Sequence, residues 1–255
     1  MQLVACIEWL FQAEHPGFGD RVLAAHAAGL AGVELHLWRD KPLDAIERAL
    51  AGTGMRLASF CVDPRASLVD PAEHPVVLQA VRDAIPVAQR FAGAAMIVAS
   101  GFTRTGVPAP EQQASAVTVL REAARLAGDA GTRLLLEPVN MTINGARMFV
   151  DGVQRGLDIV EQVGSPALRL LCDVYHSAVT GEVLASAIGG RMQYIGHVQV
   201  ADNPGRHEPG TGTLDWPTIM RLLRDQGYDG DIGLEYLPSR PTLESLALTR
   251  RTLAL

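Results

Sequence analysis

The chain contains four short apolar runs in its second half: RLLLE at residues 133–137, LRLLCD at 168–173, YIGHVQ at 194–199 and DIGLE at 231–235. Each run is polar only at its flanks and at its carboxyl-terminal end, which is typical of a parallel strand buried on both faces. The four runs end on side chains that can bind a metal, namely Glu137, Asp173, Gln199 and Glu235. Because the carboxyl-terminal ends of the strands of a parallel barrel meet at one face, these side chains are expected to converge.

The same alternation of strand-like and helix-like segments extends over the whole chain, about eight times. Four further strands are expected near residues 3–7, 32–36, 55–61 and 95–99. Helices are expected near residues 20–30, 43–51, 75–91, 110–130, 150–163, 183–188, 216–226 and 243–255. Strict alternation implies a parallel sheet, and 255 residues fit a single (β/α)8 TIM barrel that occupies residues 1–255 as one domain. The alternative is an open doubly wound sheet, which would scatter the four strand ends along an edge.

Composition excludes several classes of partner. A net charge of −6 argues against a surface that grips nucleic acid, so no nucleic acid partner is expected. Three scattered cysteines, Cys6, Cys61 and Cys172, indicate a reducing compartment. The first residues have neither a basic region nor a long apolar stretch, so a cytoplasmic protein without a signal peptide or a membrane partner is expected. A homo-oligomer stays open.

The four strand-end side chains suggest a metal centre with two proton carriers. All four offer oxygen, which suits one divalent ion, with magnesium or manganese ahead of zinc and cobalt. Moving a carbonyl between adjacent carbons requires one group that removes a proton and one that returns it. Glu137 and Glu235 are therefore the candidate catalytic residues, because two carboxylates beside a metal can exchange protons while the metal stabilises an enediolate.

Several motifs give the chain a resemblance to a known family. Glu137-Pro138, DVYH at 173–176 and QVADNPGRHEPGTG at 199–212 resemble the xylose-isomerase-like barrel superfamily. With GYDG at 227–230 and GLEY at 233–236, the sequence looks like the hydroxypyruvate isomerase family in particular. The resemblance covers about residues 130–240. It implies a metal held by Glu137, Asp173, Gln199 and Glu235, an acid/base role for the two glutamates, and substrate contacts from His176 and Arg206.

Other residues are candidates for the substrate pocket. Arg206 suits a carboxylate, because a guanidinium can bind it with two parallel hydrogen bonds, and His207 follows it in the same loop. Trp38 is expected to wall the pocket, as is Trp9, since sugar-like ligands pack on aromatic faces. His197 lies two residues before Gln199 and is interpreted as a hydrogen-bonded histidine one layer deeper. The segment at 61–71 is shorter than the glycine-rich loop expected of close family members.

The favoured function is metal-assisted isomerisation of a small hydroxy-keto acid, with hydroxypyruvate to tartronate semialdehyde as the best single candidate. A 2-oxo-tetronate isomerase and a ketose 3-epimerase need the same two glutamates and stay open. An apurinic-site endonuclease would need a three-zinc cluster with more histidines at the strand ends, and the acidic net charge disagrees with it. A non-catalytic sugar-binding barrel would not need both glutamates.

Overall fold

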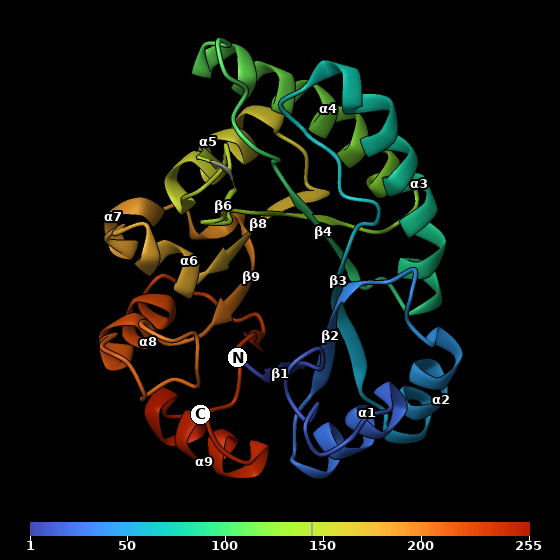
Figure 1. Ribbon diagram of the computed structural model, residues 1–255, viewed down its shortest axis with the longest axis vertical. Helices are drawn as coiled ribbons and strands as arrows, with labels where there is room; N and C mark the ends of the chain where they lie inside the picture. Colours follow the sequence, from blue (N-terminus) through green and yellow to red (C-terminus); the bar gives the residue numbers. More distant parts are fainter. Residues whose placement is uncertain (144) are drawn as a thin grey trace.

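The computed structural model describes residues 1–143 and 145–255, which form a closed barrel of eight parallel strands. The strands follow one another around the barrel in the order β1-β10-β9-β8-β5-β4-β3-β2 (Figure 1). Their bounds are Leu3–Cys6 (β1), Gly32–Leu37 (β2), Arg56–Cys61 (β3), Ala95–Ala99 (β4), Leu134–Glu137 (β5), Leu168–Asp173 (β8), Ile195–Val200 (β9) and Ile232–Leu234 (β10). Pairing of β1 with β10 closes the sheet. The predicted TIM barrel is therefore confirmed, and the open sheet is excluded.

Helices cover the outside of the barrel (Figure 1). They are α1 (Phe18–Ala27), α2 (Leu43–Thr53), α3 (His74–Arg90), α4 (Ala109–Asp129), α5 (Val153–Val163), α6 (Val174–Val179), α7 (Leu184–Ile188), α8 (Trp216–Asp225) and α9 (Thr242–Leu253). Gly54 and Gly164 end α2 and α5 in the left-handed conformation, with φ of 71° and 69°. Glycine adopts this conformation without strain, which is why glycines mark the helix ends in the sequence.

Two hydrophobic clusters fill the molecule, because successive strand residues point to opposite faces of the sheet. The larger cluster packs strands such as β5, through Leu134 and Leu136, against the helices. The smaller cluster contains the alternate residues and comprises Cys61, Ala95, Ile97, Leu135 and Leu171. Polar side chains take over toward the carboxyl-terminal ends of the strands. Among the helices that the structure describes, none has the length and apolar character needed to cross a membrane.

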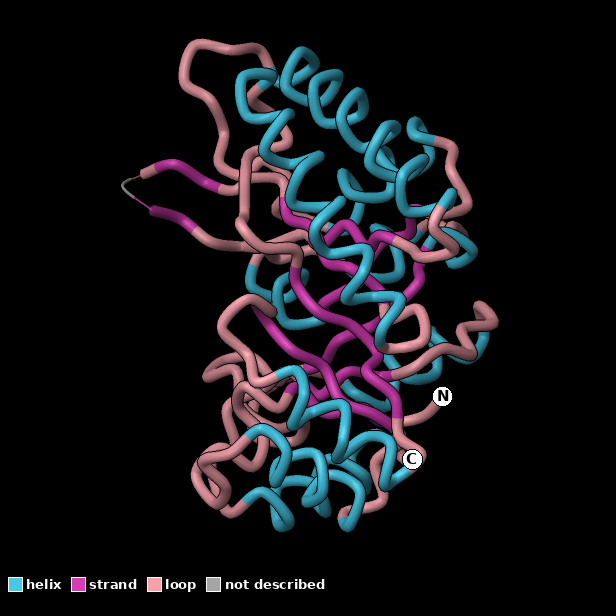
Figure 2. Tube along the Cα trace, turned by 90° about the vertical axis from the view of Figure 1, so that its right-hand side faces the viewer, coloured by secondary structure: helices cyan, strands magenta, loops and turns pink. Residues whose placement is uncertain are grey.

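The structure differs from the sequence-based expectation after β5 and after β8. An antiparallel hairpin of β6 (Thr142–Ile143) and β7 (Ala146–Arg147) follows β5 and projects away from the barrel (Figure 2). Helix α5 begins at Val153, later than expected, because Phe149 and Val150 donate backbone hydrogen bonds to the segment after β4. The extra helix α6 begins immediately after Asp173, which accepts the Tyr175 N–H at 2.8 Å and caps the helix.

Candidate active site

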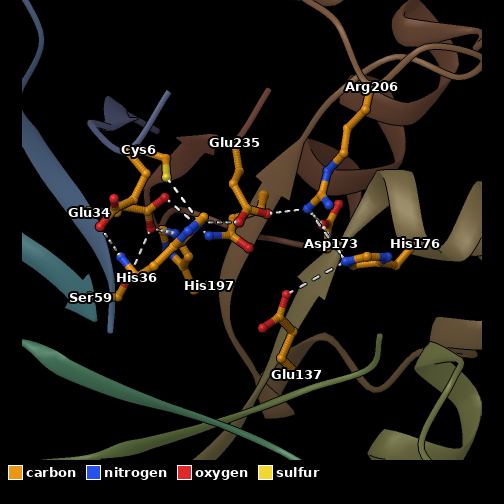
Figure 3. Close-up of polar contacts among 12 residues, drawn as sticks. Cys6, Glu34, His36, Ser59, Glu137, Asp173, His176, His197, Arg206 and Glu235 are labelled. Carbon is orange, nitrogen blue, oxygen red and sulfur yellow. Dashed lines mark hydrogen bonds and ion pairs between the residues drawn. The ribbon is translucent and has the colours of Figure 1, made fainter. Parts of the chain in front are cut away.

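The four predicted side chains lie at or near the carboxyl-terminal ends of their strands, and Figure 3 shows Glu137, Asp173 and Glu235 near one another. Asp173 lies opposite Gln199 in the sheet register, and Gln199 lies opposite Gly233, two residues before Glu235. One side-chain atom each of Glu137, Asp173 and His176 lies within 4.8 Å of the others. Asp173, Gln199 and Glu235 are buried. The convergence follows from the topology, since each of these residues ends or follows a parallel strand.

Arg206 reaches into this group of carboxylates from the loop after β9 (Figure 3). Its Nη2 donates to Glu235 Oε2 at 2.7 Å and lies 3.6 Å from Asp173 Oδ2. The guanidinium carbon lies 4.7 Å from the centre of the Trp9 ring and 4.9 Å from that of Tyr175. The arginine is therefore held between two aromatic rings as a counter-ion of the carboxylates.

Glu235 and Glu137 have different environments. Burial opposes ionisation of Glu235, but the hydrogen bond with His36 and the charge of Arg206 outweigh it and hold the pKa of Glu235 at about 2. His36 Nε2 lies 2.9 Å from Glu235 Oε1. Burial, followed by the charges of Glu235 and Asp173, raises the pKa of Glu137 well above its ordinary value. Paired carboxylates with opposite shifts are suited to opposite roles in proton transfer.

His176 lies near the carboxylates of Asp173 and Glu137. Its Nε2 is 3.4 Å from Asp173 Oδ2 and 3.9 Å from Glu137 Oε1, and its Nδ1 contacts Asn140 Oδ1. Burial and the charge of Arg206 lower the pKa of His176 to about 4. The imidazole is thus neutral near pH 7, where it can exchange hydrogen bonds with a ligand without adding charge.

Two buried oxygen atoms in this site lack hydrogen-bond partners within the described part of the chain and are therefore available to bind a metal. Asp173 Oδ2 and Gln199 Oε1 have no hydrogen-bond partner among the described residues. Burial, followed by the charge of Glu235, also raises the pKa of Asp173 to about 8. A buried acceptor without a partner costs about 1–3 kcal/mol, and coordination to a cation is one way to offset that cost. The donor set of carboxylate and amide oxygens therefore fits a hard divalent ion.

A cavity of about 770 Å³ opens over this group of residues. Its lining includes Glu137, Glu235, His176, Arg206 and Trp9, and continues along two segments, at residues 62–70 after β3 and at residues 139–143 and 148 after β5. Within the described part of the chain, Trp38 and His207 are absent from the lining. The Trp38 ring packs under the Arg39 guanidinium, and His207 Nδ1 lies 2.7 Å from the Leu237 carbonyl oxygen. Their substrate-binding roles stay predictions that this geometry does not favour.

The cavity also contains residues outside the predicted site. His36 alternates with Glu34 along β2, and this alternation indicates from the sequence that the two side chains share a face, but it assigns neither a role. Arg65 lines the cavity from the shortened loop, and no carboxylate of the described residues lies within 4 Å of it. No local pattern pointed to Asn140, which reaches His176 from a different loop.

Buried carboxylates anchor the loop that holds Arg206. Asp202 accepts hydrogen bonds from the Trp216 indole (2.9 Å) and the Gly210 backbone (2.7 Å). Glu208 accepts from the Ser239 hydroxyl and from Arg240 Nε, both at 2.7 Å. Both side chains are completely buried. The position of the guanidinium therefore depends on contacts well outside the cavity.

We expect Asp202→Asn to lower the free energy of unfolding by about 2–4 kcal/mol, because bonds to a buried charged acceptor contribute about 1.5–3 kcal/mol each. Burial opposes ionisation, but the bonds from Trp216 and the backbone lower the pKa of Asp202. The stability that ionised Asp202 contributes is thus complete above the pKa that this carboxyl has in the unfolded chain. It is lost as pH falls through the lower pKa of the folded protein. Urea unfolding at pH 7 and at acid pH measures this effect. The difference in free energy of unfolding between parent and variant should be smaller at acid pH. Asp225→Asn on the exposed face of α8 is the control; equal effects of the two would contradict the prediction.

Comparison with known proteins agrees with the fold and identifies the family. Residues 22–252 match the model of a family described as xylose isomerase-like TIM barrel. The sequence is 33% identical to a putative hydroxypyruvate isomerase of Homo sapiens, over 98% of this chain and 94% of that protein. It is 28% identical to a 2-oxo-tetronate isomerase of Cupriavidus necator, over 91% and 92%. A crystal structure described as an AP endonuclease of family 2 from Brucella melitensis superimposes with a TM-score of 0.87 at 27% identity, over 97% of both chains.

Proposed function

Because this chain is an isomerase that belongs to the xylose isomerase-like TIM barrel family, we propose that it acts on a small hydroxy-keto acid with the help of one divalent ion. The best single candidate reaction is hydroxypyruvate to tartronate semialdehyde. The observation that supports this most directly is that Glu137 and Glu235 line the same cavity, where Arg206 donates a hydrogen bond to Glu235. A 2-oxo-tetronate substrate and 3-epimerisation of a ketose are the alternatives at the same site.

The reaction needs two proton transfers between adjacent carbons. One glutamate takes the proton from the hydroxymethyl carbon, and the other gives a proton to the former keto carbon. The glutamate that took the carbon-bound proton gives a proton to the former keto oxygen. The glutamate that gave its proton takes one from the former hydroxymethyl oxygen. Both carboxyl groups thus return to their starting states, and the cycle balances. A divalent ion held by Asp173, Gln199 and the two glutamates would supply positive charge beside the substrate oxygens.

The carboxylate of the substrate is proposed to bind Arg206. The guanidinium uses Nη2 for Glu235, whereas its Nε is buried and has no hydrogen-bond partner among the described residues. A buried donor without a partner is costly, and a ligand oxygen would satisfy it. Trp9 and Tyr175 fix the plane of the guanidinium, so the direction of such a bond is defined. Arg65 supplies a second positive charge along the same cavity.

Substitution of Arg206 by lysine tests the substrate class. Lysine keeps the charge but loses the planar donor fork, so we expect kcat/KM for hydroxypyruvate to fall by about 10–100-fold. A neutral ketose such as tagatose has no carboxylate and should lose much less. Steady-state kinetics on both substrates measure the ratio, and Arg125→Lys, an exposed arginine on α4 that pairs with Glu122 and does not line the cavity, is the matched control. A parent enzyme that prefers tagatose would instead favour the epimerase.

The endonuclease name of the Brucella structure is a second candidate function to test. Strands β3, β4 and β9 end at or near Cys61, Ser100 and Gln199, where a three-zinc cluster would need additional histidines. The net charge of −6 is also unfavourable for contacts with DNA phosphates. We therefore expect no strand cleavage when the metal-loaded protein is incubated with DNA that contains apurinic sites.

A further inference from the structure

A second polar cluster lies inside the barrel, next to the carboxylates and on the side away from Glu137 (Figure 3). It consists of Glu34 on β2, Ser59 on β3, and His197 and Gln199 on β9. The exposed fractions are 1% for Glu34 and Ser59, 5% for His197 and 3% for Gln199. A buried carboxylate is costly unless its oxygens are hydrogen-bonded, so the contacts of Glu34 require an explanation.

Glu34 divides its two oxygens between different partners. Oε1 accepts from the Ser59 hydroxyl at 2.8 Å and lies 2.5 Å from His197 Nε2. Oε2 accepts from the Gln199 side-chain Nε2 at 3.2 Å. Gly233 on the neighbouring strand leaves space for this contact, because a Cβ there would lie 2.5 Å from Glu34 Oε2 and 2.8 Å from Gln199 Cγ.

The contact with Glu34 determines which way the Gln199 amide faces. An ionised carboxylate only accepts hydrogen bonds, so it selects the NH2 side of the amide. The amide oxygen then points away from Glu34, and it is the buried oxygen that has no hydrogen-bond partner in the described chain. The reverse orientation would place the amide oxygen against a carboxylate oxygen and turn the NH2 group, which cannot bind a cation, to the side away from Glu34.

We propose that Glu34 is a positioning residue that holds the Gln199 oxygen toward the metal, an inference that rests on the metal-dependent function proposed above. Glu34 itself does not touch the metal or the substrate. Its role is to fix the orientation of the neutral Gln199 amide, so that the amide oxygen can serve as a metal ligand. Outer partners of this kind typically contribute about 10–100-fold to metal affinity.

The first test is the dissociation constant of Mn²⁺, measured by electron paramagnetic resonance without any substrate. Glu34→Gln places an amide opposite Gln199 that can donate to its oxygen and turn it away, so we expect affinity to fall by about 10–100-fold. Ser59→Ala removes one bond to Glu34 but leaves the bond to Gln199, and its affinity should stay close to that of the parent. Unchanged affinity in folded Glu34→Gln would overturn the proposal.

A double-mutant cycle separates positioning from the field of the Glu34 charge. If Glu34 acts through the amide, Glu34→Gln should have no further effect on Mn²⁺ binding once Gln199→Ala has removed that amide. An equal loss in both backgrounds would mean that the charge acts directly, and it would overturn the proposal.

An exchanged pair covers the case in which Glu34→Gln alone does not fold. In the double variant Glu34→Gln, Gln199→Glu, the amide donates to the carboxylate, and the second carboxylate oxygen faces the metal. We expect this protein to bind Mn²⁺ at least as tightly as the parent, and a loss as large as that of Gln199→Ala would contradict the proposal. A parent protein that binds no Mn²⁺ contradicts the proposed function itself, which distinguishes the two failures.

Discussion

Replacement of Glu137 or of Glu235 by glutamine should lower kcat by about 10²–10⁴-fold or more while leaving the fold intact. Glutamine fills the same volume and still offers a carbonyl oxygen, but it cannot take up or release a proton. Each glutamate is proposed to make one of the two transfers, so neither can replace the other. Because the loss arises at the chemical step, it should appear in kcat at saturating substrate and metal.

Glu73→Gln is the matched control for these two variants. Glu73 lines the same cavity, but it contacts the Ser67 backbone N–H rather than the central carboxylates. Its substitution should leave kcat close to that of the parent. Circular dichroism and thermal unfolding should be used to check that all three variants are folded. Near-full activity of either central variant at saturating metal would contradict the proton transfer by two glutamates. A parent protein that is itself inactive would instead favour a non-catalytic binding barrel.

Removal of the divalent ion should also abolish turnover. Three carboxylates surround the reaction site with Arg206 as a nearby cation, and the enediolate adds further negative charge. A bound ion contributes several kcal/mol of charge stabilisation, so we expect a loss on the order of 10³-fold after exhaustive chelation. Activity is then measured after return of each metal separately. Magnesium or manganese is expected to restore it best, with zinc and cobalt as the alternatives.

The same ion should stabilise the folded protein. A ligand present at 100 times its dissociation constant adds about 2.7 kcal/mol when it binds only the native state. The midpoint of thermal unfolding should therefore rise with Mn²⁺ concentration in the parent, and rise much less in Asp173→Asn, which weakens a proposed ligand. Full activity in protein shown by elemental analysis to be free of metal would contradict the role of the ion.

The barrel could be predicted because strand pattern and topology are encoded locally. The run at Leu168–Asp173 is apolar, short and flanked by turn signals, and it forms β8 with the expected bounds. The hairpin β6–β7 could not be predicted, because each of its strands has only two residues. Strands this short cannot show the alternation of apolar and polar residues that identifies a strand in a sequence. Helix α6 was missed because Asp173 ends a strand and caps a helix at the same time.

The strand-end residues of the site were predictable for a similar reason, because parallel closure alone brings Glu137, Asp173 and Glu235 together. Contacts between side chains that are distant in the sequence could not be predicted. The pair His36 and Glu235 joins residues 199 positions apart, and no spacing rule connects them. Trp38 lies just beyond β2 and packs on Arg39, whereas Trp9 lines the cavity; an aromatic residue near a strand end does not reveal which way its ring turns.

The cavity wall formed by the loop at residues 62–70 and by residues 139–143 and 148 has a consequence for how such a protein diversifies. Neither loop contributes one of the four proposed ligands, so insertions and exchanges there alter the shape offered to a substrate without moving the proton carriers. Laboratory evolution toward a longer or uncharged sugar should therefore begin with a library confined to these two loops. Selected clones are expected to keep the metal requirement of the parent while their preference among substrates changes.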